Sequence, residues 1–207
     1  MEQSNWSENI IIVDADYVDQ VAFNLIVNFE RMLERRIPQA DLAKWLVCVA
    51  LDGGMRPPQA SGNEEQASST HVILIHEKAN MALRNFTPGH FKNELNAKAF
   101  NDQLGEFSIS AVPVEPITTK EELLTETLQF VCSQKDVKRV MVVPDAGQYG
   151  SVKRVLDQIG SDEKRITVFA MEPMPSGRWH RQEILGYSLM AALGIRGEEL
   201  STANNEL

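Results

Sequence analysis

The chain has 207 residues, a formal net charge of −9, 43% hydrophobic and 24% charged residues, values typical of a globular protein with one substantial core. It contains no apolar run of the ~20 residues that span a bilayer, and its polar start does not resemble a secretory signal, so we expect a cytoplasmic protein. The net acidity disfavours broad nucleic-acid binding, because most of that affinity comes from neutralising phosphates.

Six apolar runs predict β-strands. Most of them are continuous rather than alternating in hydrophobicity, which is typical of strands covered by helices on both faces. In chain order the expected strands are Ile10–Asp14, Trp45–Leu51, His71–His76, Phe107–Val114, Arg139–Val143 and Ile166–Met171.

Helical patterns lie between these runs. The pattern at Thr118–Lys135 opens with a threonine followed three residues later by a glutamate, which predicts a capping box. Strands alternating with helices predict an α/β fold: a single three-layer domain over residues 1–207, with a mainly parallel six-stranded sheet flanked by helices. The expected helices are Tyr17–Arg36, Thr87–Leu104, Thr118–Lys135, Gln148–Ile159 and Arg178–Leu193.

One connection departs from this alternation. Residues 53–70 are polar, rich in Gly, Pro and Ser, and have no helical period. Loops of this length are functional or disordered, so we expect a mobile loop, with the strands around it forming an antiparallel pair. The final residues, 201–207, are expected to be a loose tail.

Acidic residues follow several of the expected strands. Ligands of open α/β sheets bind beyond the carboxyl ends of the strands, and converging carboxylates can bind Mg²⁺ or Mn²⁺. Acids also favour the first turn of a helix, so each acid taken alone is more readily explained as a cap. Asp14 lies two residues before the expected cap, Asp16, so capping explains it less naturally. For Asp14 taken together with Asp145, the two hypotheses are about equal.

Two stretches resemble known nuclease families. "IIIVDADYV" is similar to the opening of NYN and PIN domains, and "RVMVVPDAGQYGSVKRVLDQIG" followed by "RITVFAM" resembles their later block. The resemblance implies a PIN/NYN-like or Rossmann-like fold with Asp14 and Asp145 as catalytic acids. It also implies that Asp14, Asp16 and Asp145 bind a metal ion, Mg²⁺ or Mn²⁺.

The chain departs from the pattern of these families in two places. The families' later turn carries two aspartates before its aromatic residue, whereas Gln148 precedes Tyr149 here. The usual middle acid has only weak substitutes, Asp52 or Glu115. We therefore expect an eroded carboxylate site and a non-catalytic interaction module. A metal-dependent nuclease or phosphoryl hydrolase is the first alternative.

Two further features suggest binding. Gly147, Gly150 and Ser151 at the start of a helix could offer N–H groups to a phosphate, so a nucleotide- or phosphate-binding domain is the second alternative. The motif lacks the full phosphate-loop spacing, so an ordinary turn explains it more simply. The expected helix 178–193 is apolar around much of its circumference, and it is either buried in the core or shared in a homodimer.

Overall fold

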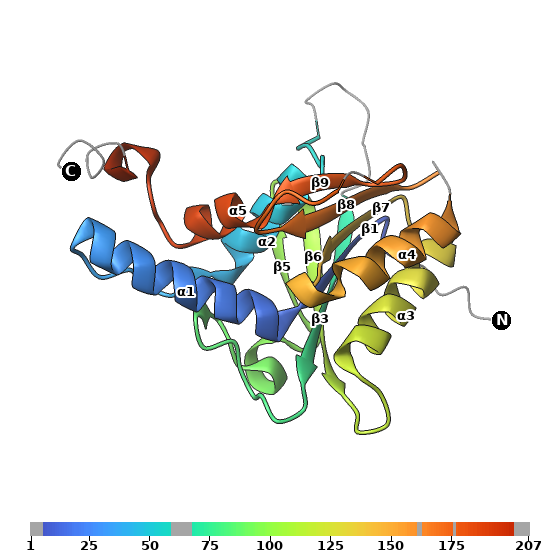
Figure 1. Ribbon diagram of the computed structural model, residues 1–207, viewed down its shortest axis with the longest axis horizontal. Coiled ribbons are helices and arrows are strands. Elements are labelled where there is room, and N and C mark those ends of the chain that lie inside the picture. The colour runs from blue at the N-terminus through green and yellow to red at the C-terminus, as the bar shows by residue number, and fades with distance from the viewer. Residues whose placement is uncertain (1–5, 59–67, 161–162, 176, 201–207) are drawn as a thin grey trace.

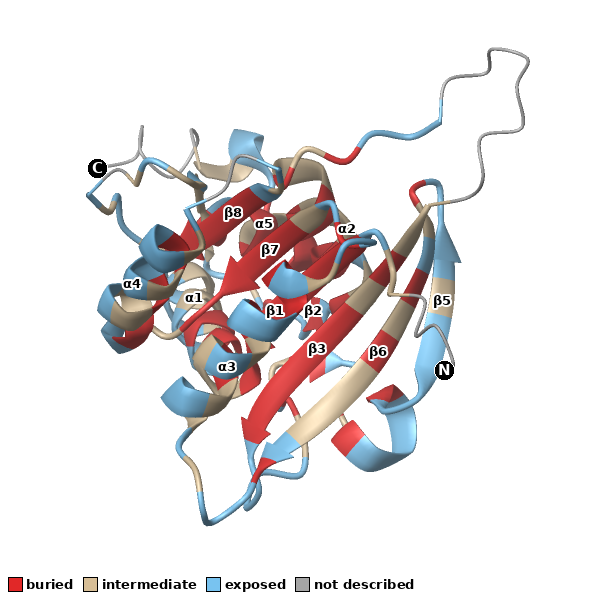
Figure 2. Cartoon of the chain, turned by 90° about the vertical axis from the view of Figure 1, so that its right-hand side faces the viewer, coloured by how far each residue is buried: buried red, intermediate tan, exposed pale blue. Residues whose placement is uncertain are grey.

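The apolar run that opens the chain forms β1 (Asn9–Asp14), a fully buried strand at the centre of the sheet. Its side chains alternate between two hydrophobic cores. Ile11 and Val13 pack with α1, α2 and α5, whereas Ile10 and Ile12 pack with α3 and α4. The sheet is therefore covered by helices on both faces, as Figures 1 and 2 show.

The computed structural model describes residues 6–58, 68–160, 163–175 and 177–200. The expected mobile loop 53–70 lies partly, and the expected tail 201–207 wholly, outside these residues. The helical elements are α1 (Ala15–Leu33), α2 (Leu42–Asp52), η1 (Phe91–Leu95), α3 (Lys120–Ser133), η2 (Ala146–Gln148), α4 (Tyr149–Ile159) and α5 (Leu185–Ala192). The remaining strands are β2 (Ala40–Asp41), β3 (Ser69–Glu77), β4 (Phe86–Thr87), β5 (Lys98–Asp102), β6 (Gly105–Val114), β7 (Arg139–Val143), β8 (Arg165–Ala170) and β9 (Arg181–Ile184).

Within the described residues, seven strands form the main sheet in the order β5-β6-β3-β1-β7-β8-β9. Only β5 pairs in an antiparallel manner, with β6, and the other pairs of this sheet are parallel. This confirms the expected α/β fold with a mainly parallel sheet flanked by helices, with one more strand than predicted. The expected antiparallel pair around residues 53–70 is wrong, because the segment before this loop is helix α2 and β3, after it, pairs in parallel with β1 and β6.

The run Trp45–Leu51, predicted as a strand, lies in helix α2. A short apolar run fits a buried helix as well as a buried strand, and here the spacing decides. The buried residues of α2 are three or four positions apart, and Asp41 caps the helix by accepting from the Lys44 N–H at 3.0 Å. The buried residues of α2 are Leu42, Trp45, Leu46, Val49 and Ala50.

Two predicted helices are partly strands. In Thr87–Leu104 only η1 is helical, and β5 follows, where Phe100 pairs with Phe107 and stacks on it at 4.9 Å between ring centroids. In 178–193, β9 pairs with β8 before α5 begins. Both strands lie at the edges of the sheet, where pairing with the neighbouring strand in the chain, β6 for β5 and β8 for β9, overrides the local helical pattern. The α5 N-terminus has no side-chain cap that could have marked the boundary.

Candidate functional site at the carboxyl edge of the sheet

Asp14 ends the central strand β1 and is fully buried. It is itself the N-cap of α1, because its Oδ1 accepts from the Tyr17 N–H at 3.0 Å. The expectation that the cap would be Asp16 is therefore wrong. The Oδ2 atom of Asp14 accepts a hydrogen bond from the side-chain amide of Gln148 at 3.2 Å. Burial raises the pKa of the Asp14 carboxyl, although the nearby Lys120 ammonium and the Tyr17 N–H favour the ionised form.

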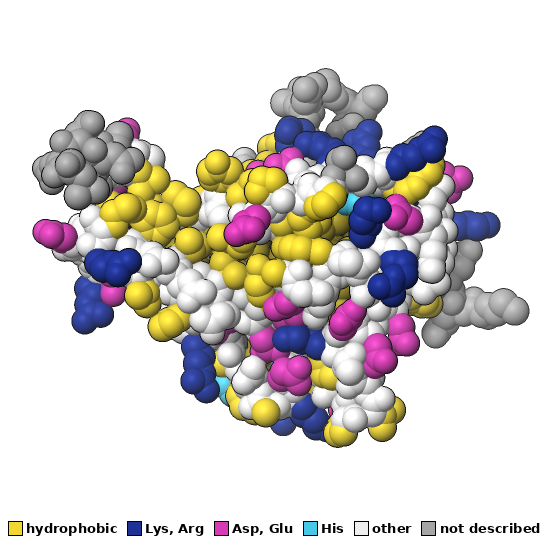
Figure 3. Space-filling model, viewed as in Figure 1, with side chains coloured by type: hydrophobic (Ala, Val, Ile, Leu, Met, Phe, Trp, Pro, Cys, Tyr) yellow, Lys and Arg dark blue, Asp and Glu magenta, His cyan; other side chains and the backbone are white. Residues whose placement is uncertain are grey.

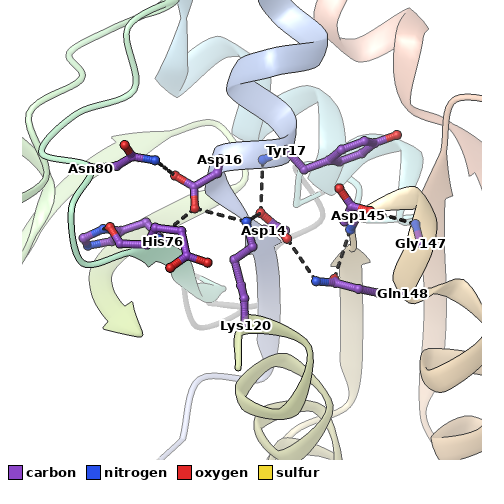
Figure 4. Close-up of polar contacts among 10 residues, drawn as sticks. Asp14, Asp16, Tyr17, His76, Asn80, Lys120, Asp145, Gly147 and Gln148 are labelled. Atoms are coloured by element: carbon purple, nitrogen blue, oxygen red, sulfur yellow. Dashed lines mark hydrogen bonds and ion pairs between the residues drawn. The ribbon is translucent and has the colours of Figure 1, made fainter. Parts of the chain in front are cut away.

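Lys120 brings a positive charge into this site. Its Nζ lies 3.0 Å from Asp14 Oδ1 and 3.1 Å from Asp16 Oδ2, and only 18% of its side chain is exposed. Burial alone would lower the pKa of Lys120, but the two carboxylates outweigh it and raise that pKa. One ammonium group thus pairs with two aspartates and offsets one of their two negative charges, as Figure 4 shows.

Asp16 joins this cluster to the end of β3. Its Oδ2 accepts from the Glu77 N–H at 2.7 Å, and its Oδ1 accepts from the Asn80 side-chain amide at 2.6 Å. All four carboxylate oxygens of Asp14 and Asp16 therefore contact a donor from the protein itself. A metal ion could bind both residues only by displacing Lys120.

Asp145 follows β7, the strand parallel and adjacent to β1, at the same edge as Asp14. The third expected ligand is thus placed near the other two, but Gln148 lies between them. Its Oε1 accepts from the Asp145 N–H at 3.1 Å while its amide donates to Asp14. Figure 4 shows the Asp145 carboxylate turned towards Gly147, whose N–H it accepts at 2.7 Å.

The glycine-bearing turn expected to hold a phosphate has acidic partners. The Gly147 N–H donates to Asp145, and the Ser151 hydroxyl donates to Glu121. A Cβ at Gly150 would meet no atom within 4 Å, so no neighbouring group packs closely against the backbone at this glycine. Two carboxylates thus occupy donors that a phosphate would need, and their charge opposes an anion.

The two substitutes for a middle acid lie apart from this site. Asp52 ends helix α2, and its pKa is raised by burial and by Glu183 and lowered by Arg56, none of which is a partner of Asp14 or Asp16. Glu115 forms a largely exposed ion pair with Lys78 at 2.6 Å. Among the described residues, no three His, Cys, Asp or Glu side chains are grouped so that they could hold a metal ion.

Lys120 is the site residue that sequence reasoning missed. It is the first residue of α3, where the positive end of the helix dipole disfavours a cation. A lysine directly after the cap Thr119 was therefore the available signal that an acidic partner lies nearby. The Thr119–Glu122 capping box, which was predicted, is present and fixes this end of α3.

The fold and this site define an α/β protein with two aspartates that share one lysine at the carboxyl edge of its sheet. The chain belongs to a family of unknown function (DUF6621), whose family model matches residues 3–200. No curated protein and no solved structure matches the chain. None of the helices in the described residues is long and apolar enough to cross a membrane.

Proposed function

We propose that this protein is a non-catalytic interaction module whose carboxylate cluster has a structural role. The observation that carries the proposal is the position of Lys120 between Asp14 and Asp16, with every oxygen of the two carboxylates already hydrogen-bonded or ion-paired. Mg²⁺ and Mn²⁺ need open carboxylate oxygens and several waters, which this arrangement does not offer. The cluster instead joins β1, α1, α3 and the end of β3.

The resemblance to NYN and PIN domains supports the same reading. Gln148 stands where those families carry an aspartate, and its amide donates a hydrogen bond to Asp14 rather than sharing a cation with it. The internal ammonium of Lys120 then supplies the positive charge. The Gln148 amide and the Lys120 ammonium together give the buried Asp14 carboxylate a hydrogen bond and an ion pair without a metal ion.

The second half of α1 is the candidate surface for a protein partner. No residue of α1 after Ala22 is buried, and Phe23, Val27 and Met32 have exposed fractions of 47%, 47% and 43%. Figure 1 shows this end of the helix extending away from the sheet. The segment 178–193, proposed above for a homodimer, is less suitable, because most of α5 is buried and only Tyr187 is strongly exposed.

A metal-dependent nuclease or phosphoryl hydrolase is the second candidate function. One observation favours it: Asp14, Asp16 and Asp145 lie at or just after the ends of two adjacent parallel strands, β1 and β7, at one edge of the sheet. Catalysis would require Lys120 to leave the aspartates so that Mg²⁺ or Mn²⁺ could replace it.

Thermal melts with Mn²⁺ distinguish the two functions, because a ligand that binds the native state must raise the melting midpoint. We expect no shift for the wild type in millimolar Mn²⁺. The Lys120→Met variant, which frees the aspartates, should gain a shift and so show that the assay detects binding at this site. A wild-type shift that disappears in Asp14→Asn would contradict the non-catalytic proposal and support the metal enzyme.

A further inference from the structure

A basic pocket of about 490 Å³ lies at the amino edge of the sheet, opposite the carboxylate cluster. We call it the amino-edge pocket. It is lined by the backbone after α2 at Gly54, by the starts of β8 and β9, and by five basic side chains, namely Arg56, Lys164, Arg165, Arg178 and Arg181. In Figure 3, basic side chains gather along the top of the molecule, where β9 lies in Figure 1.

Arg139 adds a sixth positive charge from beneath this pocket. Its Nη1 is 3.6 Å from the point where a Cβ on Gly54 would lie, and Nη1 of Arg181 is 3.9 Å from the same point. Gly54 has φ +91°, a conformation that also favours glycine. Six of the chain's 20 lysines and arginines therefore gather here, although the chain carries a net charge of −9.

Arg139 and Arg165 are like charges on neighbouring strands. They are direct partners in the register of β7 and β8, an arrangement that costs stability. The Nε and Nη1 atoms of Arg139 are buried and have no hydrogen-bond partner. Burial lowers the pKa of Arg139, and the nearby Arg165 and Arg56 lower it further. Buried donors without a partner are rare, and a bound ion beside them is one of the explanations for such a group.

The protein's own acceptors satisfy only part of the pocket. Glu183 binds Arg181 at 3.0 Å, and Arg56 and Lys164 donate to backbone carbonyl groups. Arg178 lies over the ring of Trp179, 4.8 Å from its centroid. Arg139 and Arg165, by contrast, have no carboxylate partner among the described residues.

We propose that the amino-edge pocket binds a small polyphosphate anion, either free or as part of a nucleotide. Guanidinium groups match phosphate oxygens in geometry and in charge, and the volume is that of a small-molecule site. A single carboxylate or phosphate would leave several of the cations unpaired, so an anion with several charges fits better. This site is separate from the carboxylate cluster and independent of the function proposed for it.

Calorimetric titration with inorganic tripolyphosphate tests this proposal, with sodium sulfate at the same ionic strength as the reference anion. We expect saturable binding of tripolyphosphate that is at least tenfold tighter than that of sulfate. Arg165 is exposed, so Arg165→Gln should leave the fold intact. This variant should weaken tripolyphosphate binding about tenfold. Arg36→Gln is the matched control, because that side chain is 96% exposed and lies after α1, outside the pocket.

Two further ligands distinguish the sources of the polyphosphate. Equal affinity for ATP and tripolyphosphate would show that the phosphate chain alone is recognised, whereas tighter binding of ATP would identify a nucleotide as the ligand. The proposal is overturned if tripolyphosphate does not bind, or if Arg36→Gln weakens binding as much as Arg165→Gln does. Binding of a ten-residue oligothymidine but not of tripolyphosphate would also overturn it, in favour of a nucleic-acid strand.

Discussion

At the carboxyl edge of the sheet, Lys120 lies between two aspartates, and each charge has a partner within 3.1 Å. At the amino edge, Arg139 lies beside Arg165 on the next strand, and two of its buried nitrogen atoms have no partner. Both edges belong to the same sheet, and both take ionisable groups out of water. They differ in whether the protein itself supplies the opposite charge.

This difference indicates where a ligand is needed. Burying a charge is costly unless it is paired and hydrogen-bonded, so an edge that is internally balanced can be part of the framework. An edge with unbalanced charge is retained at a cost to stability, which is typical of functional sites. The acidic motif that dominates the sequence is therefore the weaker candidate for binding, and the scattered arginines are the stronger one.

The largest expected effect comes from Lys120→Met, which removes the positive charge from the carboxyl edge. Asp14 would remain buried without its ion pair, and breaking a buried pair from one side costs about 3 kcal/mol. Urea denaturation should show this loss in the free energy of unfolding at pH 7.

The matched control is Lys78→Met at the same edge. Lys78 also pairs with a carboxylate, Glu115, but both side chains are more than half exposed. Such surface pairs contribute about 0–1 kcal/mol, so this change should be nearly silent. Equal losses of unfolding free energy in the two variants would show that the buried Lys120 pair contributes no more than a surface ion pair. The proposed difference between the two edges of the sheet would then be wrong.

Much of the sheet could be predicted because its central strands are continuous apolar runs. The strands β1, β3, β7 and β8 carry a strong local signal, since most residues on both of their faces are buried, whereas β6 is apolar but only partly buried. The edge strands β5 and β9 could not be found in the same way. They are short and polar, and they form because they pair with the predicted strands β6 and β8, not because of an apolar pattern of their own.

The candidate sites at the two edges of the sheet also differed in how much of them could be predicted from the sequence. Asp14 and Asp145 were predictable because each follows an apolar strand, and strand ends mark one edge of a parallel sheet. Lys120 and Gln148 were not predictable as their partners, because each contact joins residues more than 100 positions apart. The amino-edge arginines were equally hidden, because strand register decides that Arg139 lies beside Arg165.

A smaller effect, of opposite sign, is expected from Arg139→Met. This change removes one of two adjacent like charges and keeps an apolar stem on β7, so it should stabilise the protein by about 1 kcal/mol at low salt. Raising the NaCl concentration should stabilise the wild type more than the variant, because salt screens repulsion between charges. Urea denaturation at 0.05 and 0.5 M NaCl measures both effects. A loss of stability like that of Lys120→Met would show that Arg139 has an internal partner.

The smallest effect concerns Asp14 itself and is visible mainly through its dependence on pH. Asp14→Asn also breaks the ion pair with Lys120, but Lys120 keeps Asp16 as its partner and the asparagine keeps an oxygen that can cap α1, so at pH 7 we expect a loss of only about 1 kcal/mol in unfolding free energy. Burial raises the pKa of the Asp14 carboxyl in the folded protein above its ordinary value. The folded protein therefore takes up this proton at a higher pH than the unfolded chain does, and the wild type should gain stability relative to the variant as the pH falls from 7 towards 4.

Urea denaturation of both proteins at several pH values in this range provides the measurement. Asp41→Asn, which replaces the exposed cap of α2, is the control for changing a capping aspartate. If the wild type instead loses stability relative to Asp14→Asn as the pH falls, then the bonds from Lys120 and Tyr17 outweigh the effect of burial. The carboxyl edge would then be stabilised by its ion pair more strongly than the raised pKa of Asp14 indicates, and the contrast with the arginines at the other edge would be sharper still.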